Sequence, residues 1–271
     1  MTSKHTIQSP DGTIIHYHSI GRGPGLIIVH GALSEGTEYL ELATACSTDF
    51  TVYLIDRRGR EEKEASVPYS IEAECEDILA VQRATGAKFL FGHSYGGLIA
   101  LELLKRQHPF AAAAVYEPGL VPAQSWEWID AYENSLEQGR LRWAFTYFVM
   151  GMGYTPLSTL PKALAFCILG IAVHGENWNK KKRLLHSNLR EHKEVKRLSG
   201  GGEQYKSVTT PLLLLAGDKS PEKVKDTIEL LSRVTTNGIV RLIPGEDHFA
   251  PENDGAPMKV AAALKDYLAH L

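Results

Sequence analysis

Short apolar runs alternate with amphipathic stretches along most of the chain. Unbroken apolar runs are typical of strands buried on both faces, whereas apolar residues at every third or fourth position indicate helices that pack on a sheet. The first ten residues are mostly polar and predict no element. Strands are predicted at 14–19, 26–29, 51–55, 88–91, 111–116, 212–216 and 239–243. Helices are predicted at 36–46, 70–85, from the end of the 88–91 strand to about 107, at 221–234 and at 258–268. This alternation predicts an α/β fold with a mostly parallel sheet and helices on both faces.

The alternation stops between Pro122 and Ser207. This stretch has no buried-strand pattern and is helical and rich in large side chains, namely Trp126, Trp128, Trp143, Phe145, Tyr147, Phe148, Met150, Met152 and Trp178. It ends near Gly200-Gly201-Gly202, a candidate hinge. We expect an α/β core at 1–121 and 208–271, with residues 122–207 forming a helical insertion over the sheet. Its apolar side chains either line a substrate pocket or only pack the insertion onto the core.

Composition narrows the classes of partner. The net charge of −3 over 271 residues gives no electrostatic reason to expect nucleic acid, and the basic run 180–183 is interpreted as a solvated helix face. Three scattered cysteines show neither disulfide nor metal-ligand spacing, which suits a reducing cytoplasm. The longest small-and-apolar run, 163–173, is far shorter than the roughly 20 residues that cross a bilayer. We expect a cytoplasmic chain with a small-molecule substrate, no membrane partner and no metal. The sequence leaves open whether it forms a homodimer.

The segment Gly92-His93-Ser94-Tyr95-Gly96 carries the strongest chemical signal. It lies between the apolar runs 88–91 and 98–101, so a strand, a tight turn and a helix follow one another around one serine. This is the nucleophile-elbow pattern, which exposes a serine hydroxyl at the N-terminal end of a helix. Glycines suit such a turn because strand and helix nearly touch there. The pattern predicts Ser94 as a nucleophile.

Two further segments supply partners for Ser94. His248 follows the last predicted strand, which is where the order serine, acid, histidine places the general base. His30-Gly31 follows the buried run 26–29, so the backbone N–H of Ala32 is expected to face the elbow. The N–H of Tyr95, the residue after the nucleophile, is the second predicted donor of an oxyanion hole.

Taken together and in order, these motifs resemble the landmarks of the α/β-hydrolase fold superfamily. The resemblance rests on His30-Gly31, Asp56-Arg57-Arg58-Gly59, Gly92 to Gly97 and Gly245 to His248, and it covers about 10–121 and 208–271. It implies an eight-stranded sheet, a helical cap after the sixth strand and no cofactor. In such proteins the residues at the positions of Asp56 and Arg58 are expected to have only a structural role, holding a loop in place.

The acid departs from the pattern of that family. Similar proteins carry Gly-x-x-Asp after the seventh strand, but here Gly217 is followed by Asp218, Lys219 and Ser220. Ser220 is instead expected to cap the helix that follows it. Two candidates remain. Glu117 ends the sixth strand, where haloalkane dehalogenases place their acid, and Asp218 lies in the usual loop but two residues early. Glu117 is favoured because its extra methylene helps it reach the imidazole.

These residues predict a carboxylesterase-like serine hydrolase that cleaves a small-to-medium, mostly uncharged ester through an acyl-enzyme on Ser94. Two alternatives stay open. The same serine and histidine serve cofactor-free haloperoxidase-like enzymes and carbon–carbon hydrolases. The fold also carries small-molecule receptors that do not turn over their ligand.

Overall fold

The chain divides into two compact units. The computed structural model describes residues 2–60, 69–121 and 125–271. Its first unit comprises residues 1–122 and 200–271, and its second comprises 123–199. The expected boundary residue Pro122 lies outside the described residues.

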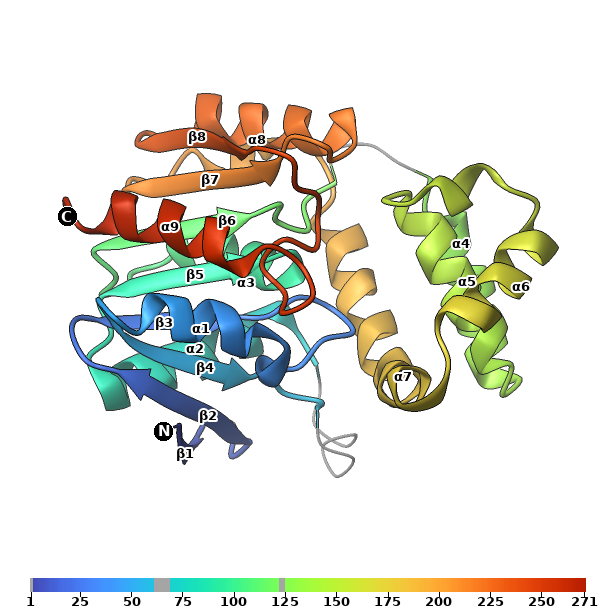
Figure 1. The fold of residues 1–271 in the computed structure, drawn as a ribbon, viewed down its shortest axis with the longest axis horizontal. Coiled ribbons are helices and arrows are strands. Elements are labelled where there is room, and N and C mark those ends of the chain that lie inside the picture. The colour runs from blue at the N-terminus through green and yellow to red at the C-terminus, as the bar shows by residue number, and fades with distance from the viewer. Residues whose placement is uncertain (1, 61–68, 122–124) are drawn as a thin grey trace. The chain divides into compact units, whose positions relative to one another are not determined.

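The first unit is built on one sheet of eight strands in the order β1-β2-β4-β3-β5-β6-β7-β8 (Figure 1). The strands are β1 Ser3–Gln8, β2 Ile14–Gly21, β3 Gly25–Val29, β4 Thr51–Asp56, β5 Phe89–His93, β6 Ala112–Tyr116, β7 Leu212–Gly217 and β8 Gly238–Ile243. Strand β2 pairs antiparallel with both β1 and β4, and the strands from β4 to β8 run parallel. The predicted mostly parallel, eight-stranded α/β fold is confirmed.

Helices cover both faces of this sheet (Figure 1). They are η1 Gly36–Tyr39, α1 Leu40–Cys46, α2 Ile71–Thr85, α3 Tyr95–Leu104, η4 Gly202–Tyr205, α8 Glu222–Val234 and α9 Pro257–Leu268. Leu26 and Ile28 of β3 belong to one buried cluster with side chains of α1 and α9. Successive strand residues point to opposite faces, so Ile27 and Val29, which are also buried, face the side that α2 and α3 cover. The unbroken apolar run of β3 follows from this double burial.

Local signals explain where α2 begins and ends. The Ser70 hydroxyl accepts the backbone N–H of Ala73 at 3.2 Å, as expected of an N-cap. Gly86 ends the helix in the left-handed conformation, at φ 66°. Two elements differ from expectation. Strand β1 was not predicted, and the expected helix 36–46 starts as the separate 3₁₀ turn η1.

In the second unit, the described residues form helices between β6 and β7 of the chain. They are α4 Glu127–Glu137, α5 Leu141–Met152, η3 Pro156–Thr159, α6 Lys162–Ala172 and α7 Gly175–Arg197. Aromatic side chains pack on one another inside this unit. The ring centroids of Trp143 and Phe166 lie 4.4 Å apart, and the Arg142 guanidinium lies 3.9 Å from the ring centroid of Trp178. These contacts give several of the large apolar side chains a packing role within the unit.

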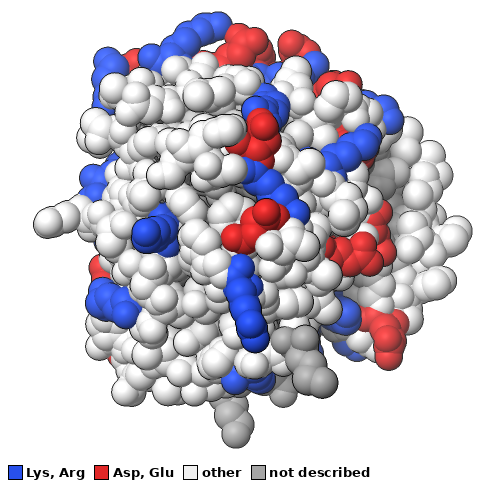
Figure 2. Space-filling model, turned by 60° about the vertical axis from the view of Figure 1, so that its left-hand side comes forward, with Lys and Arg blue, Asp and Glu red and all other residues white. Residues whose placement is uncertain are grey.

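None of the helices in the described part of the chain is both long and apolar enough to cross a membrane. Figure 2 shows lysine and arginine side chains interspersed with acidic ones over one face, separated by broad uncharged areas.

Candidate active site

Ser94 occupies the sharp turn between β5 and α3. Its backbone is left-handed, at φ 54° and ψ −119°, a conformation that costs a non-glycine residue about 1–3 kcal/mol. Neighbouring backbone holds it there. The Ser94 N–H donates to the carbonyl of Tyr116 at 3.0 Å, and the Gly119 N–H donates to the Ser94 carbonyl at 2.8 Å. The turn leaves the serine side chain partly exposed, at the N-terminal end of α3.

The two glycines of the elbow are required by close backbone approach. A Cβ atom on Gly92 would lie 2.3 Å from the carbonyl oxygen of Gly96. A Cβ on Gly96 would lie 2.3 Å from the carbonyl oxygen of Val29 and 2.6 Å from that of His30. A side chain at Gly92 would therefore force β5 and α3 apart, and a side chain at Gly96 would force α3 away from the end of β3.

His248 links Ser94 to a buried carboxylate. Its Nε2 lies 3.1 Å from the Ser94 Oγ, and its Nδ1 lies 2.8 Å from Oε2 of Glu117. An ionised carboxylate only accepts hydrogen bonds, so the Nδ1–H donates to Glu117 and the Nε2 lone pair faces the serine hydroxyl. The Glu117 side chain is fully buried and that of His248 is 10% exposed. The structure therefore brings three of the predicted site residues into one line.

Glu117 is held by donors from the β7–α8 loop. Its Oε1 accepts the backbone N–H of Gly217 at 2.8 Å and the hydroxyl of Ser220 at 2.5 Å. Its own backbone is left-handed, at φ 43°. Ser220, which stands where similar proteins carry the acid, thus donates to the acid of the neighbouring strand. The expectation that Ser220 caps α8 is wrong, because the N-cap of α8 is Pro221.

Asp218 is engaged elsewhere. Its Oδ1 accepts the backbone N–H of Gly245 at 2.7 Å, and the residue is exposed. This contact ties the β7–α8 loop to the loop that carries His248.

Three aromatic residues that the sequence analysis left without a role fix the backbone around His248. The Tyr116 hydroxyl donates to the carbonyl of Asp247 at 2.6 Å. His93 Nε2 lies 2.8 Å from the carbonyl of His248, and Tyr39 Oη lies 2.5 Å from Nδ1 of His93. Burial holds the pKa of His93 well below its ordinary value, so the ring is neutral. The Nε2–H must donate to the carbonyl, and Nδ1 must accept the Tyr39 hydroxyl proton.

The same chain of bonds continues to the loop after β3. The Tyr39 oxygen accepts the backbone N–H of Gly31 at 3.1 Å. Gly31 lies against Ser94, since a Cβ on it would be 3.1 Å from the Ser94 Cβ. Ala32, the next residue, and Tyr95, the first residue of α3, carry the two backbone N–H groups predicted for an oxyanion hole. Tyr95 is the first residue of α3, and its N–H belongs to the N-terminal end of that helix, the end at which helices bind anions.

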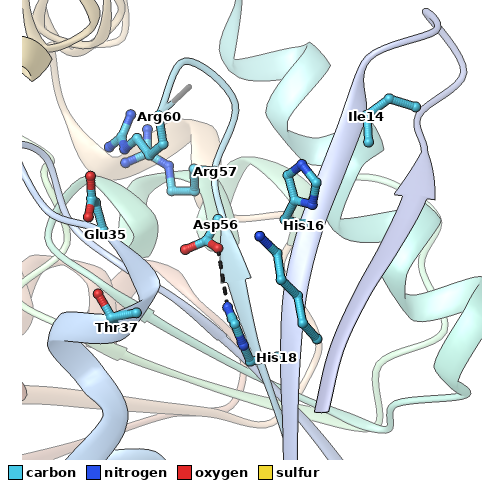
Figure 3. Close-up of a pocket in the computed structure, with 9 residues that line it drawn as sticks. Ile14, His16, His18, Glu35, Thr37, Asp56, Arg57 and Arg60 are labelled. Carbon is cyan, nitrogen blue, oxygen red and sulfur yellow. Dashed lines mark ion pairs between the residues drawn. The ribbon is translucent and has the colours of Figure 1, made fainter. Parts of the chain in front are cut away.

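Asp56 and Arg58 lie away from the Ser94 hydroxyl. The Arg58 guanidinium binds both carboxylate oxygens of Asp77, at 2.6 and 2.7 Å. Asp56 accepts the backbone N–H of Gly36 at 3.1 Å, and burial raises the pKa of its carboxyl above the ordinary value. Asp56 also lines a polar cavity of about 240 Å³ (Figure 3), and neither Ser94 nor His248 is among the described residues that line it. The described residues that line it are Lys4, Ile14, His16, His18, Glu35, Thr37, Asp56, Arg57 and Arg60.

Within residues 2–60, 69–121 and 125–271, no cluster of three or more histidine, cysteine or acidic side chains is arranged to hold a metal ion.

Comparison with known proteins agrees with this architecture. A family model described as "Alpha/beta hydrolase family" matches residues 26–263, which is most of the chain. The chain belongs to the alpha/beta hydrolase family.

Among curated proteins, one similar protein is "Uncharacterized hydrolase YraK" of Bacillus subtilis, 31% identical over 109 residues. That alignment covers 38% of this chain and 40% of YraK. A second is a pimeloyl-[acyl-carrier protein] methyl ester esterase of Xanthomonas campestris, 26% identical over 159 residues and covering 58% of each chain. The chain thus matches only about half the length of these relatives.

Solved structures of alpha/beta hydrolases match over nearly the whole chain. One from Sphaerobacter thermophilus shares 26% identity at a TM-score of 0.83, covering 97% of this chain and all of that one. The esterase RhEst1 from Rhodococcus sp. shares 20% identity at a TM-score of 0.68, covering 98% of both chains. The second likeness concerns the fold alone.

Proposed function

We propose that this alpha/beta hydrolase is a serine hydrolase that cleaves small-to-medium, mostly uncharged carboxylic esters through an acyl-enzyme on Ser94. One observation carries the proposal: His248 lies within hydrogen-bond distance of both the Ser94 hydroxyl and the buried carboxylate of Glu117. A nucleophile, a base and an orienting acid in this order are the requirements of acyl transfer by a serine.

Acylation begins at the Ser94 hydroxyl. Its proton passes to His248 Nε2 while its oxygen bonds to the ester carbonyl carbon, and the carbonyl oxygen takes the negative charge. In this proposal the N–H groups of Ala32 and Tyr95 stabilise that oxyanion. The tetrahedral intermediate collapses as the carbon–oxygen bond to the alcohol breaks, and His248 gives its proton to the departing alcohol. A water molecule then repeats the sequence on the acyl-enzyme, releasing the carboxylic acid and restoring Ser94.

Glu117 serves as the acid of this triad in the proposal. The carboxylate keeps the His248 proton on Nδ1 and stabilises the imidazolium that forms during attack. Complete burial strengthens the interaction because little solvent screens it. Ser220 and Gly217 supply the two hydrogen bonds that hold the carboxylate in place.

Two considerations support esters as the substrate class and the second unit as the cap. One relative is named as a methyl ester esterase. The unit at 123–199 follows β6 in the chain, where the sequence placed a cap at 122–207.

The test uses a fluorophosphonate probe and p-nitrophenyl esters of increasing acyl length. The expected results are covalent labelling of Ser94 and sustained turnover of the shorter esters. Ser94→Ala should abolish labelling and lower kcat by at least about 10⁴-fold. The same variant should keep its unfolding free energy within about 0.5 kcal/mol of the wild type, because the side chain is partly exposed.

Three results would overturn the proposal. Turnover that survives Ser94→Ala identifies another nucleophile. Fluorophosphonate labelling of Ser94 without sustained turnover of any p-nitrophenyl ester assigns the chain to the small-molecule receptors. Peroxide-dependent halogenation or carbon–carbon cleavage, with no ester turnover, assigns it to the other serine-triad enzymes.

A further inference from the structure

Arg57, at the end of β4, forms a buried ion pair with Glu74 of α2. Its Nε and Nη2 donate to the two carboxylate oxygens at 2.9 and 2.6 Å. The two side chains are 1% and 2% exposed. A buried bidentate pair of this kind often contributes little net stability, because desolvating both charges offsets their attraction. Its geometry suggests a role in positioning other groups.

The guanidinium contacts both segments that carry the predicted oxyanion donors. Its Nη1 donates to the carbonyl of Gly31 at 3.0 Å, and its Cζ lies 4.6 Å from the centre of the Tyr95 ring. Tyr69 joins the same group. Its hydroxyl donates to Glu74 at 2.7 Å and lies 2.8 Å from the Tyr95 hydroxyl. Because the Tyr69 proton goes to the carboxylate, the Tyr95 hydroxyl must donate to the Tyr69 oxygen.

The Gly31 carbonyl is held on one side by several donors. Besides Arg57, it accepts from His30 Nδ1 at 2.9 Å and from Arg60 Nη2 at 3.4 Å. Burial and the charges of Arg60 and Arg57 lower the pKa of His30, so its ring is neutral. The backbone N–H of Arg57 donates to His30 Nε2 at 3.2 Å, which leaves the His30 proton on Nδ1. Figure 3 shows the Arg57 and Arg60 side chains close together beyond Asp56, at one end of the polar cavity.

Peptide geometry carries this constraint to Ala32. In a trans peptide the carbonyl of one residue and the N–H of the next point in opposite directions. With the Gly31 oxygen bound to Arg57, the Ala32 N–H points away from the guanidinium. Gly31 itself packs on Ser94. Fixing the carbonyl therefore fixes the direction of the N–H beside the nucleophile.

We propose that Arg57, anchored by Glu74, is the positioning residue of the oxyanion hole. It orients the Ala32 N–H through the Gly31 carbonyl and steadies the first turn of α3 through the Tyr95 ring. This inference rests on the proposed function. Arg57 itself does not touch the reacting atoms.

Arg58 provides a matched control from the adjacent position. It also forms a buried bidentate pair, with Asp77 of α2, and its side chain is 5% exposed. Its other contacts are with Asp11 and the Ala73 carbonyl, away from Gly31 and Tyr95. We compare the double variants Arg57→Met/Glu74→Gln and Arg58→Met/Asp77→Asn. Removing both partners avoids leaving one buried charge unpaired.

Two measurements separate positioning from a purely structural role. Hydrogen–deuterium exchange of the Ala32 and Tyr95 amides should accelerate in the Arg57 variant and stay at the wild-type rate in the Arg58 variant. For a p-nitrophenyl ester, the Arg57 variant should lose about 100-fold in kcat with little change in KM, the size of loss seen when one oxyanion donor is removed. Its affinity for a trifluoromethyl ketone, which forms a charged tetrahedral adduct on the serine, should fall in parallel. The Arg58 variant should stay within about threefold in both quantities.

The inference is overturned if the two variants lose kcat equally at equal thermal stability. It is also overturned if the Arg57 variant exchanges the Ala32 amide at the wild-type rate. Failure of the proposed function gives a different result, in which the wild type itself neither turns over esters nor labels at Ser94. In that case the exchange rates alone still decide whether Arg57 orients the Gly31–Ala32 peptide.

Discussion

Replacing Glu117 with glutamine tests the acid of the proposed triad. The Gly217 N–H and the Ser220 hydroxyl donate hydrogen bonds to Glu117 Oε1. The His248 Nδ1–H donates to Glu117 Oε2. Glutamine has a single acceptor oxygen. If that oxygen stays with Gly217 and Ser220, the amide NH₂ faces Nδ1 and forces the imidazole proton onto Nε2. His248 then presents N–H, rather than a lone pair, to Ser94.

The reverse orientation of the glutamine is less favourable. It would place the NH₂ against the Gly217 N–H, leaving a buried donor unpaired at a cost of about 1–3 kcal/mol. The wrong histidine tautomer therefore dominates. The analogous aspartate-to-asparagine change in a serine protease triad lowers kcat about 10⁴-fold, which corresponds to about 5 kcal/mol of transition-state stabilisation.

The assay is kcat and KM for a short p-nitrophenyl ester, with a thermal melt of each variant. Asp218→Asn is the control. It changes a carboxylate in the same region that contacts the Gly245 N–H. We expect Asp218→Asn to keep kcat within about threefold of wild type and Glu117→Gln to lose several orders of magnitude without unfolding. If Glu117→Gln retains more than about a tenth of wild-type kcat, His248 does not depend on this carboxylate for its orientation.

Two further predictions concern stability. Gly96→Ala should destabilise the fold by at least about 3 kcal/mol, because its Cβ would collide with the carbonyls of Val29 and His30. Gly170→Ala is the control, at a helical site with open space around it, and should stabilise the fold by up to about 1 kcal/mol. Urea unfolding of both variants measures this, and equal stabilities would contradict the steric explanation. Burial lowers the pKa of His30 and His93 in the folded state. Below about pH 6.5 both histidines are therefore protonated in the unfolded chain but stay neutral in the folded protein. Unfolding free energy is then fully retained above that pH and should fall on acidification, by up to about 1.4 kcal/mol per pH unit for each histidine. His93→Gln should remove one of these two contributions, and an unchanged pH slope would refute the assignment.

The sequence predicted best where burial leaves a strong apolar signal. Strands β3, β5, β6 and β7 are buried on both faces, and their unbroken apolar runs located them. Strand β4 is half-buried at Thr51 and Tyr53, but its apolar run still located it. Strand β1 was missed because it lies at the edge of the sheet and most of its side chains are exposed, so no apolar pattern marks it. The helix at 36–46 was placed correctly but not its 3₁₀ start, because that turn depends on contacts of Glu35 and Glu38 rather than on hydrophobic spacing.

Proximity in the candidate site was harder to predict than its residue types. The order of the motifs along the chain indicated that Ser94 and His248 lie close together. The choice between Glu117 and Asp218 as the acid depended instead on which side chain can reach the imidazole from its strand. The Ser220 hydroxyl indicates Glu117 as the acid because it donates to that carboxylate. This contact follows from the pairing of β6 with β7, which the sequence alone does not specify. Arg57 was passed over because a charged residue in a turn after a strand usually faces solvent. Its partner Glu74 lies on α2, 17 residues further along the chain, and no sequence pattern links the two positions.

The order of the site residues along the chain also determines the order in which they become available during translation. Ser94 and Glu117 are synthesised before the 123–199 unit, and His248 is synthesised after it. Strands β7 and β8 must then join the open edge at β6 before the imidazole reaches its neighbours. A chain still attached to the ribosome thus carries Ser94 without its proposed base until the residues around 248 have emerged, and a product truncated before residue 248 lacks that base altogether.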